Sequence, residues 1–314
     1  MRTVLTLSIL LLFCFAGKAQ RVVWWNVENL FDCQHDTLKE DRDFLPEGSY
    51  RWTRGRYWRK LDDLSRTIAA IAGDGEWPMV VGMCEVENDT VLRDLTRRSP
   101  LRRARYAYVH EEGPDERGID VAMLYDSLQL RLLGYETRRI PSKEKGFRPT
   151  RDILHAWGQC PTLSDTLHFV VVHLPSRAGS GMRGEMHRRL AVATLCSLLD
   201  ELAGKKVLLM GDFNAEPRDK IFRDIGMRMT SLMPQGRKAL RKEHGTYYFR
   251  NIWSYIDHIL VTDSLLPCVK GSVAVGRFPF LLTEKGSPRR TFQGPIYKGG
   301  ISDHLPIWVD LESR

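Results

Sequence analysis

The chain has 314 residues, of which 43% are hydrophobic and 27% are charged, and its formal net charge is +8. This composition is typical of a globular protein and excludes a disordered or fibrous chain. No repeat, charge block or Pro/Gly/Ser-rich linker interrupts the chain after its N-terminus. We therefore expect residues 20–314 to form a single domain.

The first 19 residues have the pattern of a secretory signal peptide. Arg2 gives a positive start, Val4–Phe15 is an apolar run, and Gly17 and Ala19 are small residues before a cleavage point at Gln20. The apolar run is too short to span a membrane, and no later stretch approaches the necessary length. We expect an exported protein, periplasmic or secreted, that has no stable membrane insertion and is a monomer. Its basic charge suits an anionic partner such as nucleic acid.

The N-terminal half is predicted to alternate strands and helices. Val22–Trp25 has the character of a buried strand and ends at Asn26. The apolar residues of Leu61–Ala72 are spaced as one face of a helix, and Met79–Met83 is a second buried strand that ends at Glu85. Asn88 is expected to cap a helix that continues to about residue 98.

A long stretch between the first strand and the first helix, residues 32–59, is predicted to be irregular. Loops of this length in compact domains are usually functional or disordered. This one could grip phosphates and stack bases, or it could be a lid packed on the domain, and both readings stay open. Its basic and aromatic residues are Tyr50, Arg51, Trp52, Arg54, Arg56, Tyr57, Trp58 and Arg59.

Strands dominate the rest of the chain, which favours mixed β-sheets covered by helices over a purely parallel sheet. One long amphipathic helix, Glu185–Leu202, interrupts them, and Leu281–Gly300 is expected to be a loop. The predicted strands are Tyr106–His110, Ile119–Tyr125, Leu130–Ile140, Ile153–Cys160, Leu167–Val172, Val207–Met210, Tyr247–Phe249, Ile256–Val261 and Pro306–Leu311.

Polar groups recur at the ends of these apolar strands. A buried carboxylate at a strand end is unfavourable unless it is paired or binds a metal, so several of them need a common explanation. A site for a hard cation with oxygen ligands provides one, and Glu85, Asp303 and the Asn26 amide suit Mg²⁺. The strand-end groups are Asn26 and Glu28, Glu85, His173, Asp212 and Asn214, Asp257, and Asp303 and His304.

The cysteines do not indicate a zinc site. Five cysteines follow the predicted signal peptide, at irregular spacing and without a Cys-x-x-Cys pair. Cys84, Cys160 and Cys196 lie in apolar stretches and are expected in the core. Histidines beside carboxylates, a divalent cation and a basic exported protein point instead to hydrolysis of phosphate esters.

The order of the motifs WWNVEN, CEVEN, VVHLPS, GDFNAEP, YIDHIL and ISDHLPI resembles the endonuclease/exonuclease/phosphatase superfamily, the DNase I-like proteins. The resemblance extends from Asn26 to Pro306. It implies a four-layer α/β sandwich, in which two mixed β-sheets lie face to face with helices on the outside. It also places the active site at one edge of the two sheets.

The resemblance further implies roles for the strand-end residues. Glu85 matches the main metal-binding glutamate, with Asn26 and Asp303 in support, and the cation is expected to be Mg²⁺, with Mn²⁺ or Ca²⁺ as alternatives. The remaining roles are catalytic. Asp212 orients or deprotonates the attacking water, and Asn214 holds a phosphate oxygen. His304 contacts the phosphate and is oriented by Asp257, and His173 lies against the phosphate.

Other polar residues are predicted to bind substrate or to be structural. Substrate binding is expected from Glu28, whose family counterpart is in some members an aspartate near the metal, and from Arg54, Arg56, Asp120 and Arg177. The alternatives without a function are that Arg177 is a solvated loop arginine and that Asp120 is an aspartate at a sheet edge. His258 alternates away from Asp257 and is expected to be structural, and His187 and Arg188 are expected on a solvated helix face.

The prediction is an exported, Mg²⁺-dependent phosphodiesterase that acts on nucleic acid as an endonuclease. The main alternative is a phosphoesterase for a phosphorylated lipid or sugar, such as a sphingomyelinase or an inositol phosphate phosphatase. For a sphingomyelinase, Phe278–Leu282 would be the apolar segment that touches the membrane. A binding protein on an inactive fold is the remote alternative, because every core position of the motifs is filled.

Overall fold

The computed structural model describes residues 19–73, 75–141, 148–176, 181–234 and 245–313, without the side chains of 181–183. The predicted signal peptide, except for Ala19, and Arg177 lie outside these residues, so they stay predictions. Across the described ranges, no helix has both the length and the apolar character that a membrane span needs.

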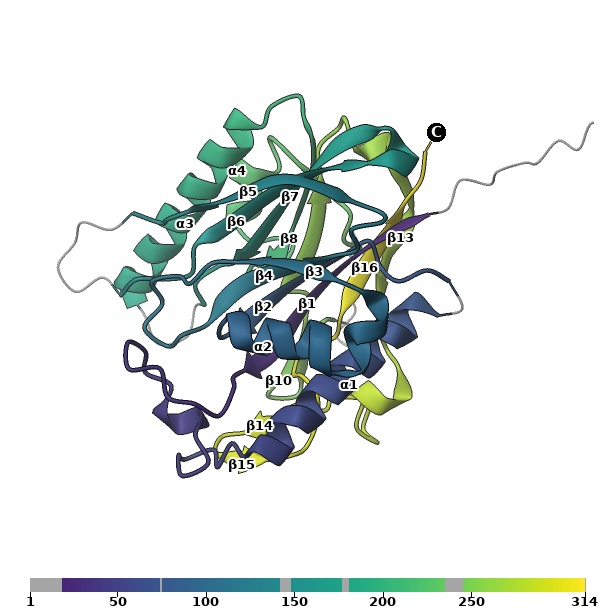
Figure 1. Ribbon diagram of the computed structural model, residues 1–314. Helices are drawn as coiled ribbons and strands as arrows, with labels where there is room; N and C mark the ends of the chain where they lie inside the picture. Colours follow the sequence, from purple (N-terminus) through teal and green to yellow (C-terminus); the bar gives the residue numbers. More distant parts are fainter. Residues whose placement is uncertain (1–18, 74, 142–147, 177–180, 235–244, 314) are drawn as a thin grey trace, which may run out of the picture.

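Two six-stranded mixed sheets face each other at the centre of the molecule (Figure 1). The first sheet has the order β13 (Val269–Val275), β16 (Ile307–Leu311), β1 (Gln20–Leu30), β2 (Val80–Val86), β4 (Asp120–Tyr125) and β3 (Ala107–His110). The second has the order β5 (Arg131–Arg138), β6 (Ile153–Cys160), β7 (Asp165–His173), β8 (Lys206–Asp212), β12 (Asp257–Val261) and β9 (Thr230–Ser231).

Each sheet contains one parallel pair, β1 with β2 and β7 with β8, and its other pairs are antiparallel. A parallel pair needs a crossover connection. Helix α1 (Arg54–Ala72) lies in the first crossover and α3 (Gly181–Glu201) in the second. The carboxyl ends of β1, β2, β7 and β8 consequently meet at one edge of the sandwich. The neighbours β12 and β16 are antiparallel to β8 and β1, so they begin at the same edge.

Side chains that alternate between the two faces of each strand fill the spaces between the layers. In β1, Trp24 faces the second sheet and packs with Met210, whereas Trp25 faces α1 and packs with Leu64. A third buried cluster joins the second sheet to α3 and to α4 (Ile221–Ile225). Since successive residues of a strand point to opposite faces, sheets buried on both sides need continuous apolar runs. The predicted four-layer α/β sandwich is confirmed.

Helix α1 begins earlier than predicted. The side chain of Thr53 caps it by accepting a hydrogen bond from the Arg56 amide, so Arg54 and Arg56 lie in its first turn and not in a loop. Trp52 and Tyr57 are buried, and Tyr50 packs on the ring of Phe292. These aromatic side chains are therefore packed on the domain, as the second of the two interpretations expected, and they are not available to stack bases.

The remaining elements are short. Asn88 caps α2 (Asp89–Arg93), as predicted, and a π-helical turn, Asp94–Arg98, continues it. The predicted loop Leu281–Gly300 contains a small hairpin, β14 (Phe292–Gln293) and β15 (Ile296–Tyr297). A second hairpin consists of β10 (Tyr247–Phe249) and β11 (Ile252–Ser254). The 3-10 turns are Arg42–Phe44, Pro100–Ala104, Pro161–Leu163, Leu266–Cys268 and Pro279–Leu281.

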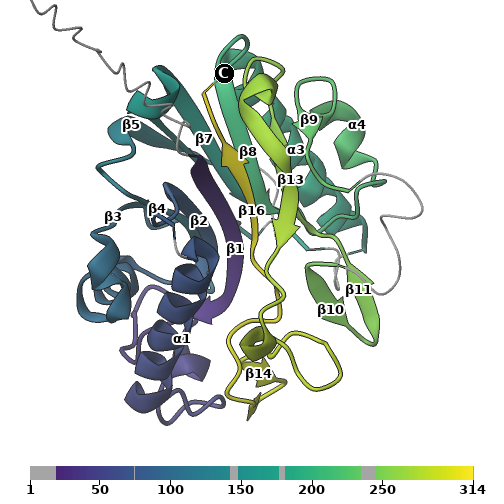
Figure 2. The same ribbon diagram turned by 90° about the vertical axis from the view of Figure 1, so that its right-hand side faces the viewer.

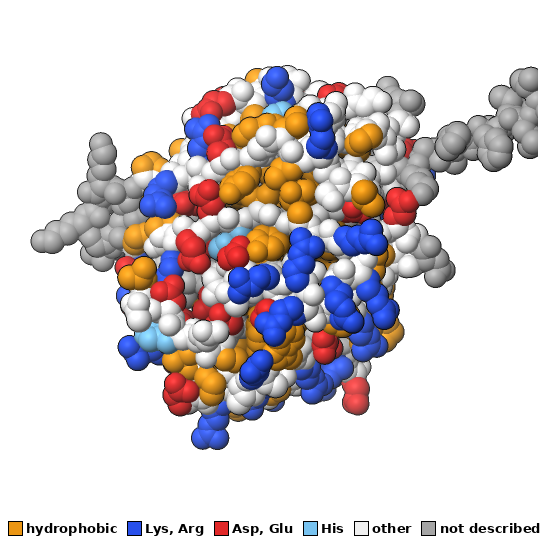
Figure 3. Space-filling model, viewed as in Figure 1, with side chains coloured by type: hydrophobic (Ala, Val, Ile, Leu, Met, Phe, Trp, Pro, Cys, Tyr) orange, Lys and Arg blue, Asp and Glu red, His pale blue; other side chains and the backbone are white. Residues whose placement is uncertain are grey.

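Many positive side chains lie on one outer face of the molecule (Figure 3). Figure 3 shows many Lys and Arg side chains over α1, α2 and the turns that follow α2. The exposed arginines of these elements include Arg59 in α1 and Arg97, Arg102 and Arg103 in the turns after α2. The five described cysteines are all free thiols, and Cys84, Cys160 and Cys196 are buried as expected.

Candidate active site

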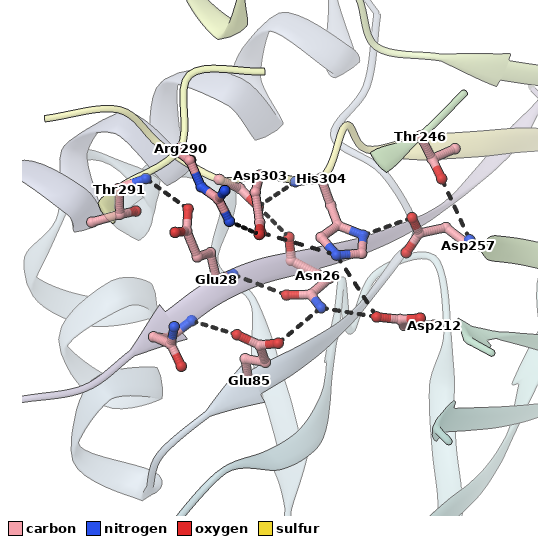
Figure 4. Close-up of polar contacts among 12 residues, drawn as sticks. Asn26, Glu28, Glu85, Asp212, Thr246, Asp257, Arg290, Thr291, Asp303 and His304 are labelled. Carbon is pink, nitrogen blue, oxygen red and sulfur yellow. Dashed lines mark hydrogen bonds and ion pairs between the residues drawn. The ribbon is translucent and has the colours of Figure 1, made fainter. Parts of the chain in front are cut away.

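Strand-end residues from both sheets meet at the common edge. Figure 4 shows Asn26 at the centre, with Glu85, Asp303, Asp212 and His304 around it. The Asn26 Nδ2 atom donates to Glu85 Oε1 and to Asp212 Oδ2, both at 3.1 Å. Asn26 thereby joins a carboxylate of the first sheet to one of the second. Residues 186 positions apart in the chain meet in this contact, as the motif order predicted.

The backbone is strained where β1 and β2 present these groups. Glu28, Asn29 and Glu85 have φ of 51°, 52° and 61°, in the left-handed region that non-glycine residues seldom adopt. The bend in β1 places the Asn29 amide 2.9 Å from Glu85 Oε2. The strand does not end at Asn26 as predicted, because it continues through this irregularity to Leu30. Strain of this kind persists where surrounding contacts enforce it and is frequent at active sites.

His304 is held by a buried carboxylate. Its Nδ1 lies 2.8 Å from Asp257 Oδ2, and the other Asp257 oxygen accepts a hydrogen bond from Trp24 Nε1 at 2.8 Å. Burial opposes a charge on His304, but the Asp257 carboxylate outweighs it and raises the pKa of His304 well above its ordinary value. Burial alone would raise the pKa of Asp257, and the charged His304 lowers it instead. The pair is therefore an imidazolium and a carboxylate.

Asp212 lies between two histidines of different charge. Its Oδ2 is 3.8 Å from His304 Nε2 and 3.6 Å from His173 Nε2. Burial raises the pKa of Asp212 to about 7, although the His304 charge works in the opposite direction. A carboxylate with a pKa near neutrality is suited to accept a proton from water.

His173 is a neutral imidazole. Burial lowers its pKa well below the ordinary value, and the positive charges of Arg151 and Arg117 lower it further. Its Nδ1 is buried and has no hydrogen-bond partner among the described residues. Asp115 holds both arginines, through contacts of 2.8 Å to Arg117 and 3.2 Å to Arg151. When it carries the ring proton, this unpaired buried nitrogen can donate a hydrogen bond to an oxygen of an anionic substrate.

Asn214 and Asp303 complete the edge. The Asn214 amide donates to Asp212 Oδ1 at 2.8 Å, and its side-chain Nδ2 donates to the Leu174 carbonyl at 3.0 Å. Asp303 forms an ion pair with Arg290 at 2.6 Å, and its side chain remains 15% exposed. The Tyr247 ring lies over the His304 ring with centroids 4.6 Å apart.

Two sets of residues here have groups that can hold a cation. Asp212, Asp257 and His304 offer ligand atoms within 4.8 Å of one another. However, both Asp257 oxygens accept hydrogen bonds and His304 is positively charged, so this set forms a proton-sharing network and leaves little room for a cation. Glu85 is half-buried and Asp303 partly exposed, and both supply the hard oxygen ligands that Mg²⁺ or Mn²⁺ prefers. Both Glu85 oxygens accept hydrogen bonds as well, from Asn26 Nδ2 and the Asn29 amide, and Asp303 pairs with Arg290, so Glu85 and Asp303 stay predicted ligands.

The predicted ligand Asn26 and the predicted substrate-binding residue Glu28 have other partners. The Asn26 Oδ1 atom accepts a hydrogen bond from the Glu28 amide at 3.0 Å, so Asn26 links the two carboxylates and does not turn its oxygen toward them. The Glu28 carboxylate accepts hydrogen bonds from the amides of Thr291 at 2.6 Å and Phe292 at 3.2 Å. Burial raises the pKa of Glu28 to about 8. These contacts give Glu28 a role in holding the Thr291 loop, and they do not support the expected substrate contact.

The other described residues that were predicted to bind substrate lie outside this cluster. Arg56 donates to the Tyr50 carbonyl and its guanidinium lies 4.2 Å from the centroid of the Tyr297 ring, while Arg54 is exposed at the start of α1. The Asp120 carboxylate accepts a hydrogen bond from the Gly113 amide at 2.9 Å, which fixes the preceding turn. Burial raises the pKa of Asp120 to about 7.

Arg188 corrects an expectation. It is 4% exposed, not solvated, and its Nη1 donates to the carbonyls of Pro175 at 2.6 Å and Asn214 at 3.3 Å. It therefore supports the segments that follow β7 and β8. His258 is structural as predicted, because it is buried and its Nε2 lies 2.8 Å from the Ala215 carbonyl.

Sequence reasoning missed several charged residues that build the site. These residues occur in loops or inside a helix, and no strand-end pattern marks them. The missed residues are Lys60, Asp115, Arg117, Arg151 and Arg290.

The segment proposed for membrane contact is packed on the protein. Leu281 is 2% exposed, and Phe278 and Phe280 pack against the buried cluster under α1. The Arg66 guanidinium lies 4.1 Å from the Phe280 ring centroid. Because these apolar side chains are already covered, the segment does not form an exposed apolar hairpin.

Comparison with solved structures shows the same fold over nearly the whole chain. An endonuclease/exonuclease/phosphatase family protein of Bacteroides thetaiotaomicron aligns with a TM-score of 0.61 at 18% identity, over 95% of this chain and 96% of that chain. Danio rerio TDP2, complexed with a single-strand DNA product, gives 0.58 at 16% identity, over 94% and 99%. The Bacteroides thetaiotaomicron mannosyl-6-phosphatase gives 0.53 at 17% identity, over 93% and 99%.

No curated protein matches the sequence. A family profile does match it, over residues 21–313, and that family is described as the Endonuclease/Exonuclease/phosphatase family. Its members are phosphoester hydrolases that generally depend on a divalent metal. The matched range includes every residue of the edge described above. The chain therefore belongs to the endonuclease/exonuclease/phosphatase family and is a phosphoester hydrolase.

Proposed function

We propose that the protein is an exported, Mg²⁺-dependent phosphodiesterase that cleaves nucleic acid internally. The observation that carries the reaction is the position of Asp212, whose carboxylate lies between the charged His304 and the neutral His173. This arrangement places a proton acceptor, the Asp212 carboxylate, next to a positive charge, the His304 imidazolium. The motif at residues 1–19 supports export.

Glu85 and Asp303 would hold the cation, and Asn26 would fix the Glu85 carboxylate relative to Asp212. When bound, the cation would neutralise charge on the phosphate. Asp212 would take a proton from water as the water oxygen bonds to phosphorus. The phosphorus–oxygen bond to the leaving group would break, and the leaving oxygen would take a proton from solvent.

His304 would stabilise the negative charge that grows on the phosphoryl oxygens, because Asp257 keeps its imidazole protonated and oriented. His173 would hold a phosphoryl oxygen or the leaving group through its unpaired Nδ1. The Asn214 side chain would help position a phosphate oxygen after release from the Leu174 carbonyl.

Three observations support nucleic acid as the substrate over a lipid. The chain is basic, and Danio rerio TDP2, a structural neighbour, is described in complex with a DNA product. In addition, the segment expected to touch a membrane is packed on the protein. The mannosyl-6-phosphatase among the neighbours makes a sugar phosphate the alternative that an assay must include.

The test is hydrolysis by purified residues 20–314 of plasmid DNA, RNA, sphingomyelin and mannose 6-phosphate, with Mg²⁺ and with EDTA. The double variant Asp212→Asn/His304→Gln is the control for contaminating nuclease. Metal-dependent cleavage of nucleic acid by the wild type alone is expected. Turnover of only the lipid or the sugar phosphate would contradict the proposed substrate, and failure to bind metal would contradict the mechanism.

A further inference from the structure

A groove of about 660 Å³ opens beside Asp303, at the cation side of the active site. Its two walls come from the β10–β11 hairpin and the loop that carries β14, which both lie below the sheets in Figure 2. This volume is within the range of pockets that bind small ligands or single nucleotides. The groove residues used below are Phe249, Arg250, Arg289, Arg290 and Lys298.

The groove has positive charge without a matching negative charge. Arg290 pairs with Asp303 at 2.6 Å. Within the described ranges, Arg250, Arg289 and Lys298 are exposed and form no ion pair with a carboxylate within 4.0 Å. Three cations that line one groove and lack carboxylate partners favour a ligand with several negative charges.

Two aromatic rings lead from His304 to the groove, and the second of them, Phe249, lines it. Tyr247 and Phe249 alternate with Tyr248 along β10 and so lie on the same face of the strand. The Tyr247 ring is 4.6 Å from the His304 ring, and the Phe249 ring follows at 6.3 Å with an angle of 16° between the planes. The row thus begins at the active-site histidine and ends at the tip of the hairpin.

Phe249 is the exposed end of this row, with 47% of its surface open to solvent. The turn after it holds Arg250 at φ 49° and Asn251 at φ 64°, the backbone of a tight hairpin turn. The Arg250 guanidinium lies 5.2 Å from the Phe249 ring centroid. The turn therefore displays an aromatic face and a cation together, which suits a planar ring joined to a phosphate.

We infer that this groove binds a single-stranded segment of nucleic acid next to the scissile phosphate. Phe249 stacks on an unpaired base, and Arg250, Arg289 and Lys298 bind phosphates. In a duplex the base faces are covered by their neighbours, so stacking on Phe249 selects a single strand. This inference rests on the proposed function and specifies the substrate of the same site.

The test measures binding of a fluorescein-labelled eight-residue oligothymidylate with Mg²⁺, in an Asp212→Asn background that prevents cleavage. Phe249→Ala is expected to weaken binding about tenfold, the loss of one stacked base. The control Ile252→Ala removes an apolar side chain that is 61% exposed on the other strand of the same hairpin, and binding is expected to stay unchanged.

The cations are tested through the salt dependence of the same binding. For a single strand, each lost phosphate contact reduces the slope of log K against log salt by about 0.7, so Arg289→Ala/Lys298→Ala should reduce it by about 1.4. Phe249→Ala should leave the slope as it is, because stacking releases no counterions. Lys285→Ala is the matched control, since Lys285 is exposed on the same loop but does not line the groove.

Several results would overturn the inference. One is failure of the parent to bind the oligonucleotide, and another is binding of it by Phe249→Ala with the same affinity as the parent. The others are tighter binding of a blunt duplex of the same length than of the single strand, and displacement of the oligonucleotide by mannose 6-phosphate at equal concentration. Hydrolysis of bis(p-nitrophenyl) phosphate by the wild type separates this failure from failure of the proposed function. That small ester needs only the reacting centre. If the wild type cleaves it while the groove variants bind the oligonucleotide as tightly as the parent, only the binding role of the groove is refuted.

Discussion

Substitutions at Glu85 and Asp257 can show which of the two acidic sets binds the cation. We expect Glu85→Gln to remove metal binding and Asp257→Asn to leave it within about threefold of the wild type. The reason is that Asp257 is already balanced by the charged His304 at 2.8 Å. Once Asp257 is neutralised, His304 loses the charge that keeps it protonated, so the net charge of the pair stays near zero.

The magnitudes follow from the contacts. A supporting group of a metal ligand is worth about 10- to 100-fold in affinity, so loss of a charged ligand in Glu85→Gln should cost at least about a hundredfold. The bond from His304 to Asp257 is charge-assisted and worth about 1.5–3 kcal/mol. At about 1.4 kcal/mol for each factor of ten, Asp257→Asn should lower kcat by about 10- to 100-fold.

Calorimetric titration with Mn²⁺ measures the affinity, and hydrolysis of bis(p-nitrophenyl) phosphate measures kcat. Thermal melting of both variants is the control for folding, because Asp257 is fully buried. If Asp257→Asn lost the metal while Glu85→Gln kept it, the cation would belong to the set of Asp212, Asp257 and His304. The assignment of that set to proton sharing would then be refuted.

Three further predictions concern buried charged groups. Lys60→Met should lower the free energy of unfolding in urea by about 3 kcal/mol, because the Lys60 amine donates to Thr291 Oγ1, to the Ile301 carbonyl and to the Glu28 carbonyl in the interior. His258→Leu should remove part of the pH dependence of the free energy of unfolding. Burial lowers the pKa of His258 from 6.5 to about 4, so the folded protein keeps this ring neutral. The stability that this ring contributes is therefore complete above pH 6.5 and is lost as the pH falls from 6.5 to about 4. At about 1.36 kcal/mol per pH unit, denaturation curves should show a loss of about 3 kcal/mol in the wild type that the variant lacks. Arg188→Met should lower kcat about tenfold, because Arg188 holds the segments after β7 and β8 and a small displacement of reacting groups is costly.

Each of these has a control. Arg59→Met, next to Lys60 but with a side chain 61% exposed, should change the stability by less than about 0.5 kcal/mol. An unchanged denaturation midpoint for Lys60→Met would refute the interior role of the amine. Equal pH slopes for the wild type and His258→Leu would show that other groups cause the acid sensitivity. For Arg188→Met, the exposed neighbour Arg189→Met is the comparison, and equal kcat values would contradict the positioning role.

Much of the fold was readable from the sequence because its signals are local. An apolar run that ends in a polar residue marks a strand end without knowledge of the partner strand, as at Asp212 and Glu85. Helix α3 was found from its periodicity, and α2 from its Asn88 cap. The start of α1 was missed, because arginines and aromatics hide the periodicity there and only Thr53 marks the cap.

What the sequence by itself determined is the set of groups that reach the common edge of the sheets. Tertiary structure alone decided the charge and the task of each group. Lys60, for example, has its partners 32, 231 and 241 residues away, and no local pattern distinguishes it from the exposed Arg59 beside it. Likewise, both rings are buried, which favours the neutral form, and their opposite protonation arises because Asp257 outweighs burial at His304 whereas Arg151 adds to it at His173. Burial and electrostatic interaction depend on distances in space, and the sequence specifies those distances only through the complete fold.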